Sequence, residues 1–482
     1  SEYCVLGKLM NLRPWLVATV AMATSVLSGC DLGPDYQHPV TALPAGWREA
    51  SPASQAVWPA EDWWRGFGST QLNAFIAKAE AQNFDIAAAI ARIREADAEA
   101  RIAGAALLPS VTATSAITHQ RTLLSTTSKP IEFQQFSLGA NASYEVDFWG
   151  RNHAMVEAAK ETAIASHYDE QVIALATVSS VAVSYFQALS LRDRIQVAEN
   201  NVAAAEQTLG GIHVQFRNGT VTDLNIVQQE TVVNSLRAVI PPLRQQLTQA
   251  IDALAILIGE PPENVKLAPE TLLNLSMPTV APGLPAELLE RRPDVSEAEA
   301  QLIAANANIK AARADFFPTV SLTAQGGMES LALAGFSPPA AVYGLTGGIT
   351  QPIFEGGLLR GQLELNKARY TELLGDYRKS IVSALSNVED GLAGVQRTGE
   401  QLSAEAATVS TAQRAYEISA VQYHAGTVDL LTVLTAENAL FPDEDMLVQV
   451  RLAHAQALVS LFQALGGGWR DDQMQTALAP AK

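Results

Sequence analysis

Apolar and polar side chains alternate strictly along residues 136–148. Every second position is apolar, and the intervening positions are Ser, Gly, Asn, Glu or Asp; the apolar ones are Phe136, Leu138, Ala140, Ala142, Tyr144, Val146 and Phe148. Because neighbouring side chains of a strand point to opposite faces, this period of two predicts a β-strand with one apolar and one polar face. The Thr-rich segment 111–118 precedes it, so the two segments predict a hairpin within residues 110–148 with a polar tip at 124–132.

A second hairpin is predicted in the other half of the chain. Segments 319–324 and 343–353 have strand character and flank the turn-forming residues 335–339, which places this hairpin within 319–354. Three short motifs also occur twice at nearly one offset: 107–111 and 316–320, 147–150 and 353–356, and 216–221 and 423–428. The matches indicate two tandem repeats.

Apolar residues recur at alternating intervals of three and four after each hairpin. The first such series is Val172, Leu175, Ser179, Ala182, Phe186 and Leu189, and the second is Ile381, Leu385, Val388, Leu392 and Val395. This spacing predicts long helices that pack against partner helices, within residues 151–258 and 357–465. A helix over 151–215 would be about 95 Å long. Pro241, Pro242 and Pro442 predict that both returning helices are interrupted.

The first residues of the chain predict secretion and a lipid anchor. Arg13 precedes an apolar run over 16–27, which is too short for a membrane span of roughly 20 residues and is typical of a signal peptide. The run ends in Leu27-Ser28-Gly29-Cys30, which looks like a bacterial lipobox, so we expect lipid on Cys30. The alternative is a buried free cysteine. Asp31 resembles the inner-membrane retention signal of enteric lipoproteins and conflicts with outer-membrane residence, but the predicted strands outweigh it.

These patterns divide the chain into five segments. They are a signal peptide at 1–29, a lipidated extended linker at 30–68, a first repeat at 69–280, a second repeat at 281–469 and a flexible tail at 470–482. Each repeat is expected to contain a helix, a hairpin and long helices, in that order.

Net charge and hydropathy limit the partners of the chain. The formal net charge is −18, which argues against nucleic acid and against docking on anionic lipid. Beyond the signal peptide no uninterrupted apolar run reaches about 18 residues, so we expect no membrane-spanning helix and expect any membrane crossing to be made by strands. The chain has two cysteines, Cys4 and Cys30, and cleavage before Cys30 would leave no internal disulfide.

Four strands cannot close a barrel, because the smallest closed barrels have about eight. Several chains must therefore pair their strand edges, since lipid satisfies no backbone hydrogen bond. The alternation would direct apolar residues to lipid and polar residues to a water-filled lumen. A barrel that continues into long helices is a conduit.

Several separate motifs resemble those of the OprM/NodT-type outer-membrane factors, which are lipoprotein relatives of TolC. They are Trp63-Trp64-x-x-Phe67, the segment 289–302 that begins Leu-Glu-Arg-Arg-Pro-Asp-Val, the segment 351–357, and Ala464-Leu465-Gly466-Gly467-Gly468-Trp469. The resemblance covers essentially the whole chain after the signal peptide. It implies an α+β membrane protein, a homotrimer with a 12-stranded barrel and a long helical periplasmic tunnel. It also implies an outer-membrane channel of tripartite efflux, with a periplasmic adaptor (a membrane fusion protein) and an inner-membrane pump of the resistance-nodulation-division type.

The resemblance assigns roles to the two turns that end the long helices. They are expected to form the periplasmic tip that contacts the adaptor, through Arg217, Asn218, Gly219, Thr220, His424, Gly426 and Thr427. Glycine permits the left-handed conformation that ends a helix. The alternative is that these residues only cap the helices, although a residue can cap a helix and also contact an adaptor.

The resemblance also places a periplasmic gate just after the second turn. Leu431 matches the narrowest ring of the family, but Thr435 stands where relatives often have an aspartate. An acidic ring is therefore absent, or Asp429 replaces it. Tyr423 matches the tyrosine that latches the closed tip in relatives; the alternative is an ordinary interhelical aromatic residue.

No motif of catalysis or of metal binding occurs in the sequence. HExxH, GxSxG and Walker motifs are absent, and the seven histidines are scattered singly, so we expect neither an enzyme nor a cofactor. The exported substrate stays open. Small molecules such as drugs are the first expectation, and protein secretion and heavy-metal efflux are alternatives, although the methionines form no ladder. A structural tether between two membranes is the alternative from another class, but a tether needs no hairpins.

Overall fold

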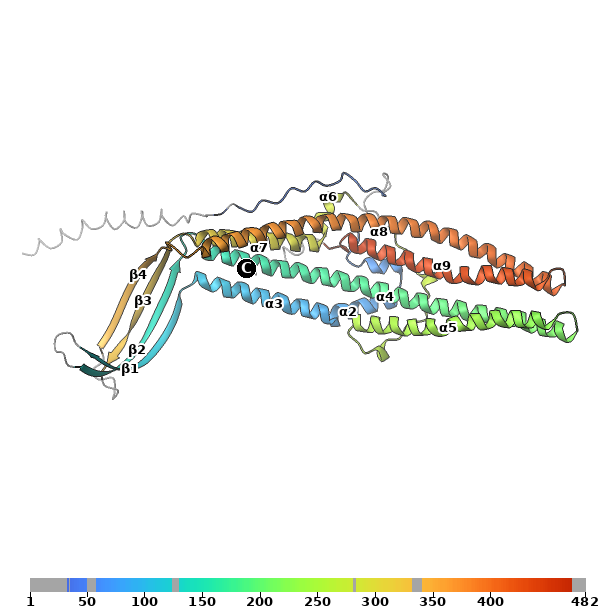
Figure 1. The fold of residues 1–482 in the computed structure, drawn as a ribbon, viewed down its shortest axis with the longest axis horizontal. Coiled ribbons are helices and arrows are strands. Elements are labelled where there is room, and N and C mark those ends of the chain that lie inside the picture. The colour runs from blue at the N-terminus through green and yellow to red at the C-terminus, as the bar shows by residue number, and fades with distance from the viewer. Residues whose placement is uncertain are drawn as a thin grey trace, which may run out of the picture. The chain divides into compact units, whose positions relative to one another are not determined.

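The computed structural model describes residues 33, 35–49, 58–123, 130–280, 283–331 and 340–469. Cys30 and Asp31, the predicted signal peptide, the tail from 470 and the tips of both hairpins lie outside these residues. The described residues form long helices and one sheet (Figure 1). The helices are α2 Thr70–Gln82, α3 Phe84–Gly104, α4 Arg151–Arg217, α5 Asp223–Leu257, α6 Pro285–Leu288, α7 Pro293–Ala314, α8 Leu358–His424 and α9 Leu430–Ala464. The strands are β1 Ser110–Leu123, β2 Pro130–Val146, β3 Thr319–Ser330 and β4 Ala340–Thr350.

The chain forms two compact units. Unit 1 comprises Ser1–Val40, Ile93–Ser166 and Ala298–Tyr377, and unit 2 comprises Thr41–Arg92, His167–Glu297 and Arg378–Lys482. Each unit therefore combines segments from both halves of the sequence. The predicted repeats do not correspond to separate compact bodies.

The four strands of unit 1 form one antiparallel sheet in the order β1-β2-β3-β4. β2 begins at Pro130, inside the segment expected to be the tip, and β3 continues to Ser330 instead of ending near 324. The Gly-rich segment 325–330 has no clear alternation, but pairing with β2 extends the strand there. β4 ends at Thr350, three residues before the expected end.

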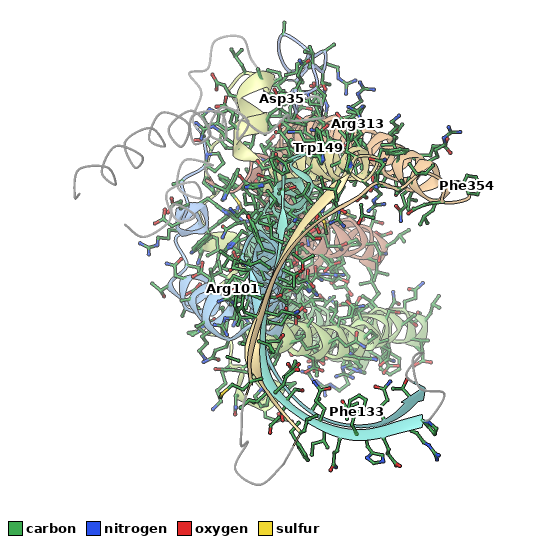
Figure 2. All side chains as sticks on the ribbon, turned by 90° about the vertical axis from the view of Figure 1, so that its left-hand side faces the viewer. Asp35, Arg101, Phe133, Trp149, Arg313 and Phe354 are labelled. Carbon is green, nitrogen blue, oxygen red and sulfur yellow. The ribbon has the colours of Figure 1, made fainter. Side chains whose placement is uncertain are left out.

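The register separates the sheet into an apolar and a polar face. Ala142, Ala324 and Leu345 lie opposite one another on one face, and Ser143, Thr323 and Thr346 lie opposite one another on the other. Figure 2 shows that the strands curve strongly and project side chains from both faces. The alternation predicted for β2 thus extends across all four strands.

Glycine permits the close approach of β2 and β3 in the middle of the sheet. A Cβ at Gly327 would lie 2.5 Å from the carbonyl oxygen of Leu138 and 2.7 Å from the Cα of Gly139. Any larger residue would push the strands apart. Glycines at these paired positions therefore accommodate the bend of the sheet.

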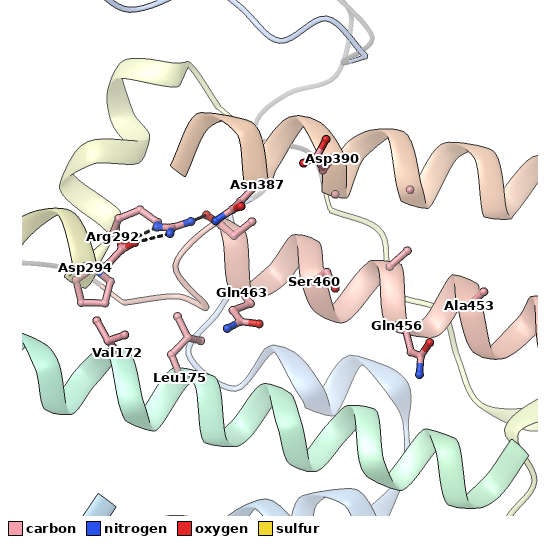
Figure 3. A pocket seen from close by; sticks show the side chains of 15 residues that line it. Val172, Leu175, Arg292, Asp294, Asn387, Asp390, Ala453, Gln456, Ser460 and Gln463 are labelled. Atoms are coloured by element: carbon pink, nitrogen blue, oxygen red, sulfur yellow. Dashed lines mark hydrogen bonds and ion pairs between the residues drawn. The ribbon is translucent and has the colours of Figure 1, made fainter. Parts of the chain in front are cut away.

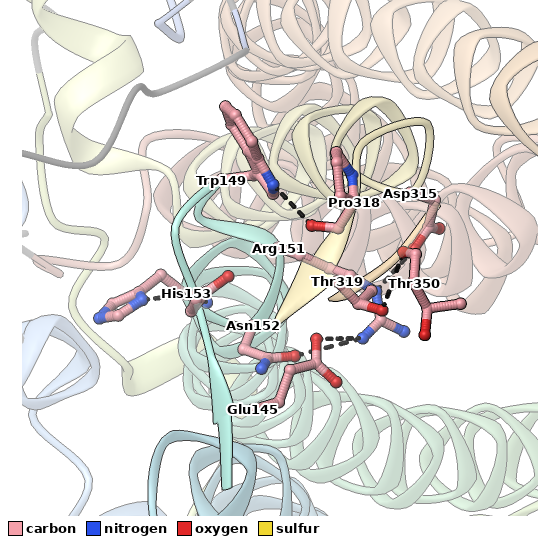
Figure 4. A network of polar contacts seen from close by, with 10 residues as sticks. Glu145, Trp149, Arg151, Asn152, His153, Asp315, Pro318, Thr319 and Thr350 are labelled. Atoms are coloured by element: carbon pink, nitrogen blue, oxygen red, sulfur yellow. Dashed lines mark hydrogen bonds and ion pairs between the residues drawn. The ribbon is translucent and has the colours of Figure 1, made fainter. Parts of the chain in front are cut away.

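The end of the sheet is joined to the helices by a polar network (Figure 4). Trp149 Nε1 donates to the carbonyl oxygen of Pro318 at 2.8 Å, and Arg151 Nε donates to Asp315 Oδ1 at 2.6 Å. Arg151 Nη1 also forms an ion pair with Glu145 Oε1 at 3.4 Å. These contacts connect the first residues of α4 to the segment between α7 and β3.

Asp147 does not lie on the polar face of β2, where its alternation with Glu145 would put it. The strand ends at Val146, and the Asp147 carboxylate accepts hydrogen bonds from the backbone N–H of His153 at 2.8 Å and pairs with its ring at 2.7 Å. A carboxylate that precedes a helix can satisfy a free N–H group of its first turn, here that of His153. Asp147 is therefore a helix-capping residue.

α4 and α8 are each 67 residues long, and α4 extends two residues beyond the helix expected over 151–215. One 18-residue window of α4 has a mean hydropathy of 1.7, and 50% of it is buried. Ser, Thr and Gln interrupt the apolar runs of α4, as expected from the sequence, but by length and composition alone this helix is apolar enough to cross a membrane. Val181, Tyr185 and Phe186 of α4 are fully buried in the core of unit 2, so packing accounts for this apolar character.

The expected interruption of both returning helices is wrong. α5 continues through Pro241 and Pro242, and α9 continues through Pro442. All three prolines are exposed in the single chain. Water can therefore solvate the carbonyl groups whose N–H partners the prolines remove.

The aromatic motif at the end of the linker is buried in unit 2. A 3₁₀ turn over Trp63–Phe67 buries both of its end residues. The centroid of the Trp63 ring lies 4.9 Å from that of Phe462, on which it stacks, and the centroid of the Phe67 ring lies 4.8 Å from that of Phe186. The linker is thus anchored in the main core through its aromatic residues.

The glycine motif after α9 fits against the Arg-Arg-Pro-Asp motif. Arg292 Nη1 donates to the carbonyl oxygen of Ala464 at 2.9 Å, and Arg292 pairs with Asp294. Gly466 has a φ of 85°, and a Cβ there would overlap the carbonyl oxygen of Arg291. Glycine is therefore required at 466 for two reasons, conformation and space.

Gly466→Ala is expected to lower the free energy of unfolding by about 3 kcal/mol or more, because a left-handed alanine is strained and its methyl group displaces Arg291. Gly426→Ala is the matched control, since Gly426 has a φ of 72° but open space around its Cα. It should cost only about 1 kcal/mol. Denaturant midpoints of the purified protein in detergent measure both, and equal midpoints would contradict the packing argument.

Candidate functional site: the helix turns and the predicted gate

The turn between α4 and α5 is closed by backbone hydrogen bonds. Gly219 N donates to Phe216 O at 2.9 Å, and Thr220 N donates to Gln215 O at 3.0 Å. Gly219 has a φ of 72°, the left-handed conformation expected from the sequence. Thr222 and Asn225 then form a capping box that starts α5.

The turn between α8 and α9 has the same geometry. Gly426 N donates to Tyr423 O at 2.9 Å, Thr427 N donates to Gln422 O at 3.0 Å, and Gly426 has a φ of 72°. The two repeats thus end their long helices in the same way. The predicted tip residues Arg217, Asn218, Gly219, Thr220, His424, Gly426 and Thr427 are all exposed, as an adaptor contact requires.

A small apolar core holds the two turns together. Its buried members come from α4, α5, the end of α8 and the start of α9; they are Ile212, Ile226, Tyr423, Leu430, Val433 and Leu434. The turns of both repeats therefore form one packed cluster.

Tyr423 is buried in this cluster and bonds to α4. Its hydroxyl donates to Gln215 Oε1 at 2.5 Å, and burial raises the pKa of the Tyr423 phenol. The sequence did not identify Gln215, because a partner more than 200 positions away gives no local signal. This bond is the contact that a latch between the two helical hairpins needs.

Leu431 and Thr435 lie one turn apart on an exposed face of α9. The Leu431 side chain is 66% exposed in the single chain, and the Thr435 hydroxyl donates to the Leu431 carbonyl oxygen at 2.7 Å. An exposed leucine beside a turn suits a ring formed with other copies of the chain. The Thr435 side chain is neutral.

Asp429 is the N-cap of α9. Its Oδ1 accepts from Thr432 N at 3.0 Å and from the Thr432 hydroxyl at 2.7 Å, and these bonds lower the pKa of the Asp429 carboxyl. A side chain bound in this way is directed to its own helix. The geometry thus gives Asp429 a capping role.

A groove of about 630 Å³ lies farther along the bundle, between α4, α8, α9 and the start of α7 (Figure 3). Gly391 and Gly394 of α8 line it, and a Cβ at Gly391 would lie 3.1 Å from Leu461 of α9. Asp294, also on its wall, is paired with Arg292. The small residues allow close helix packing. Within the described ranges of the chain, no group of three or more His, Cys, Asp or Glu side chains could hold a metal ion.

Comparison with known proteins agrees with this arrangement. The family model described as outer membrane efflux protein matches residues 75–260 and 284–467. The pyoverdine export outer membrane protein OpmQ of Pseudomonas aeruginosa is 38% identical over 463 residues, which are 94% of this chain and 97% of that protein. The cation efflux system protein CusC of Escherichia coli is 31% identical over 454 residues, which are 92% and 97% of the two chains.

Two solved structures have the same fold. The outer-membrane channel OprN superposes with a TM-score of 0.86 at 26% identity, and covers 91% of this chain and 100% of its own. CusC superposes with a TM-score of 0.82 at 30% identity, with the same coverage. The predicted fold class is confirmed: this is an α+β outer-membrane channel protein, and the part of the chain that the structure describes contains four strands and two pairs of long helices. The chain belongs to the outer membrane efflux protein family and is a channel component of efflux.

Proposed function

We propose that three copies of this chain form the outer-membrane exit duct of a tripartite efflux assembly that exports small organic molecules. The observation that supports it most is the four-stranded sheet with one apolar and one polar face. Within the described strands, β1 and β4 each pair on one side only, so three chains could close twelve strands into a barrel. The polar face would line the lumen.

We propose that the tip contacts a periplasmic adaptor, which connects the channel to an inner-membrane pump of the resistance-nodulation-division type. The two similar turns and the shared apolar cluster support one docking surface made from both repeats. The gate would be Leu431 and Thr435 with the Tyr423 latch. The capping role of Asp429 supports a gate without an acidic ring.

The cargo class is proposed from the relatives and from the site chemistry. OpmQ is named for pyoverdine export, TtgF of Pseudomonas putida (32% identical, 95% of this chain) for toluene efflux, and CusC for cation efflux. No group of three or more His, Cys, Asp or Glu side chains that could hold a metal ion occurs in the described residues, and two of these three relatives are named for the export of organic molecules, which supports an organic cargo. Protein secretion is the remaining alternative.

Deletion of the gene and complementation test this function. Cells without the gene should retain a fluorescent siderophore or dye and lose resistance to toxic organic compounds, and the intact gene should restore both. Unchanged export of small molecules with loss of a secreted protein would instead favour protein secretion. Unchanged export of both would contradict the channel.

We propose the domain organisation predicted above, with repeats at 69–280 and 281–469, and lipid on Cys30. The two separate matches of the family model support the division into repeats. Cys30→Ser should remove the acyl chains from the mature N-terminus, as measured by mass spectrometry. The trimer should stay in the membrane, because its strands bury more apolar area than acyl chains do. An acyl-free Cys30 in the parent protein would contradict the anchor.

A further inference from the structure

A polar layer crosses the helix bundle of unit 2 behind the turns. Glu437 of α9 is fully buried there. Thr208 of α4 donates to its Oε1 at 3.1 Å, and Gln229 of α5 donates to its Oε2 at 3.2 Å. Gln229 Nε2 also donates to the carbonyl oxygen of Ala205 at 3.1 Å. Glu437 thus connects the helix of the predicted gate to both helices of the first repeat.

Apolar layers enclose these polar groups on two sides. The apolar cluster of the turns lies on one side, and a second cluster lies on the other, with Ala205, Val233, Leu440 and Phe441 as its buried members. Glu437 follows Leu431 by six residues, about 9 Å along the helix axis. A change at Glu437 therefore acts close to the gate.

Among the described residues, the Glu437 carboxyl is bonded to the neutral side chains of Thr208 and Gln229, and no ion pair with a basic side chain occurs there. Burial raises its pKa, and the hydrogen bonds from Gln229 and Thr208 only partly oppose this effect. Two further titratable groups of the described residues are linked to this layer: Tyr416 of α8 bonds to Thr208 and interacts with the Glu437 charge, and Glu444 of α9 interacts with Tyr416. Neither is a cation.

The buried, neutral surroundings of Glu437 favour a protonated carboxyl. Gln229 Oε1 is buried and has no hydrogen-bond partner within the described residues. An ionised carboxylate only accepts hydrogen bonds, whereas a protonated one also donates. A buried charge held only by neutral donors is costly. Close packing of α9 on α4 and α5 therefore suits a protonated, neutral Glu437. An ionised Glu437 is better accommodated when α9 moves away and water enters the layer.

We propose that Glu437 is a positioning residue of the gate, whose protonated carboxyl holds α9 against α4 and α5 and whose ionisation loosens α9 toward the open state. The inference rests on the proposed function, since it takes Leu431 and Thr435 of α9 as the gate. It assigns the control of the gate to a buried carboxyl and not to a charged ring on the pore axis.

The pH dependence of conductance tests the proposal. The pKa of Glu437 is raised in the closed state, so protonation of Glu437 stabilises that state at acid pH. This stabilisation is lost as the pH rises from the ordinary pKa of a glutamate toward the raised pKa of Glu437. The trimer in planar bilayers should therefore increase its conductance about tenfold between about pH 5 and about pH 8. Glu437→Gln should give a low conductance that is independent of pH. Glu230→Gln, the same change at an exposed carboxyl of α5, should keep the parent profile.

Thr208→Val gives a second readout. It removes a donor that favours the charged carboxylate, so the pH at which conductance stops rising should move upward. A purely structural role would give Glu437→Gln a profile parallel to that of the parent, and that result would overturn the proposal. A parent channel that ignores pH would also overturn it. A trimer that forms no channel at any pH would instead contradict the proposed function.

Discussion

Leu345→Arg is expected to abolish the outer-membrane trimer, whereas Thr346→Arg is expected to leave it intact. The two residues are neighbours on β4, and the register places them on opposite faces of the sheet. Leu345 is 84% exposed in the single chain, on the face that would contact lipid. Arginine near the bilayer midplane costs about 2–4 kcal/mol, and a trimer would pay this three times. Arginine at 346 would lie in the aqueous lumen.

Native mass spectrometry of detergent-extracted membranes measures this prediction. The parent and Thr346→Arg should weigh three chains, and Leu345→Arg should be absent from the outer membrane or degraded. Equal amounts of trimer for both variants would contradict the assignment of the faces. A parent protein that is a stable monomer or dimer would contradict the 12-stranded barrel.

The double variant Leu431→Ser, Tyr423→Phe is expected to raise the conductance of the resting channel severalfold without dissociating the trimer. Tyr423→Phe removes the hydrogen bond to Gln215, worth about 1 kcal/mol. Leu431→Ser removes an exposed apolar side chain that would pack with its copies around the three-fold axis. Both changes destabilise the closed tip more than the open one.

Single-channel recording in planar bilayers measures the effect, and antibiotic uptake by whole cells gives a second readout. Leu224→Ser is the matched control, because Leu224 lies after the first turn as Leu431 lies after the second, and is 64% exposed. The control should conduct like the parent. If the double variant also does so as an intact trimer, the gate lies elsewhere on the chain.

Local patterns in the sequence were enough to predict most elements. The period of two in β2 comes from one strand alone, and it defined the two faces of the whole sheet. The ends of the long helices were predicted within about two residues, because Gly219 and Gly426 stop them through their own conformation. Such signals need no knowledge of the rest of the chain.

Features that depend on distant partners were missed. β3 extends to Ser330 because it pairs with β2, although 325–330 has no strand pattern of its own. The Tyr423 bond to Gln215 and the Glu437 bonds to Thr208 and Gln229 each join segments more than 200 positions apart. The prolines of α5 and α9 were misjudged because their effect depends on exposure to water, which a sequence pattern does not give.

The pairing of β2 with β3 also determines the order of events during biogenesis. β1 and β2 are neighbours in the sequence, but β3 follows β2 only after α4, α5, α6 and α7. The long edge of β2 therefore stays unpaired until the more than 170 residues between β2 and β3 have been exported. An exposed edge of this kind invites aggregation. Pairing of β2 with β3 must close this long loop, and non-local pairing of this kind slows folding.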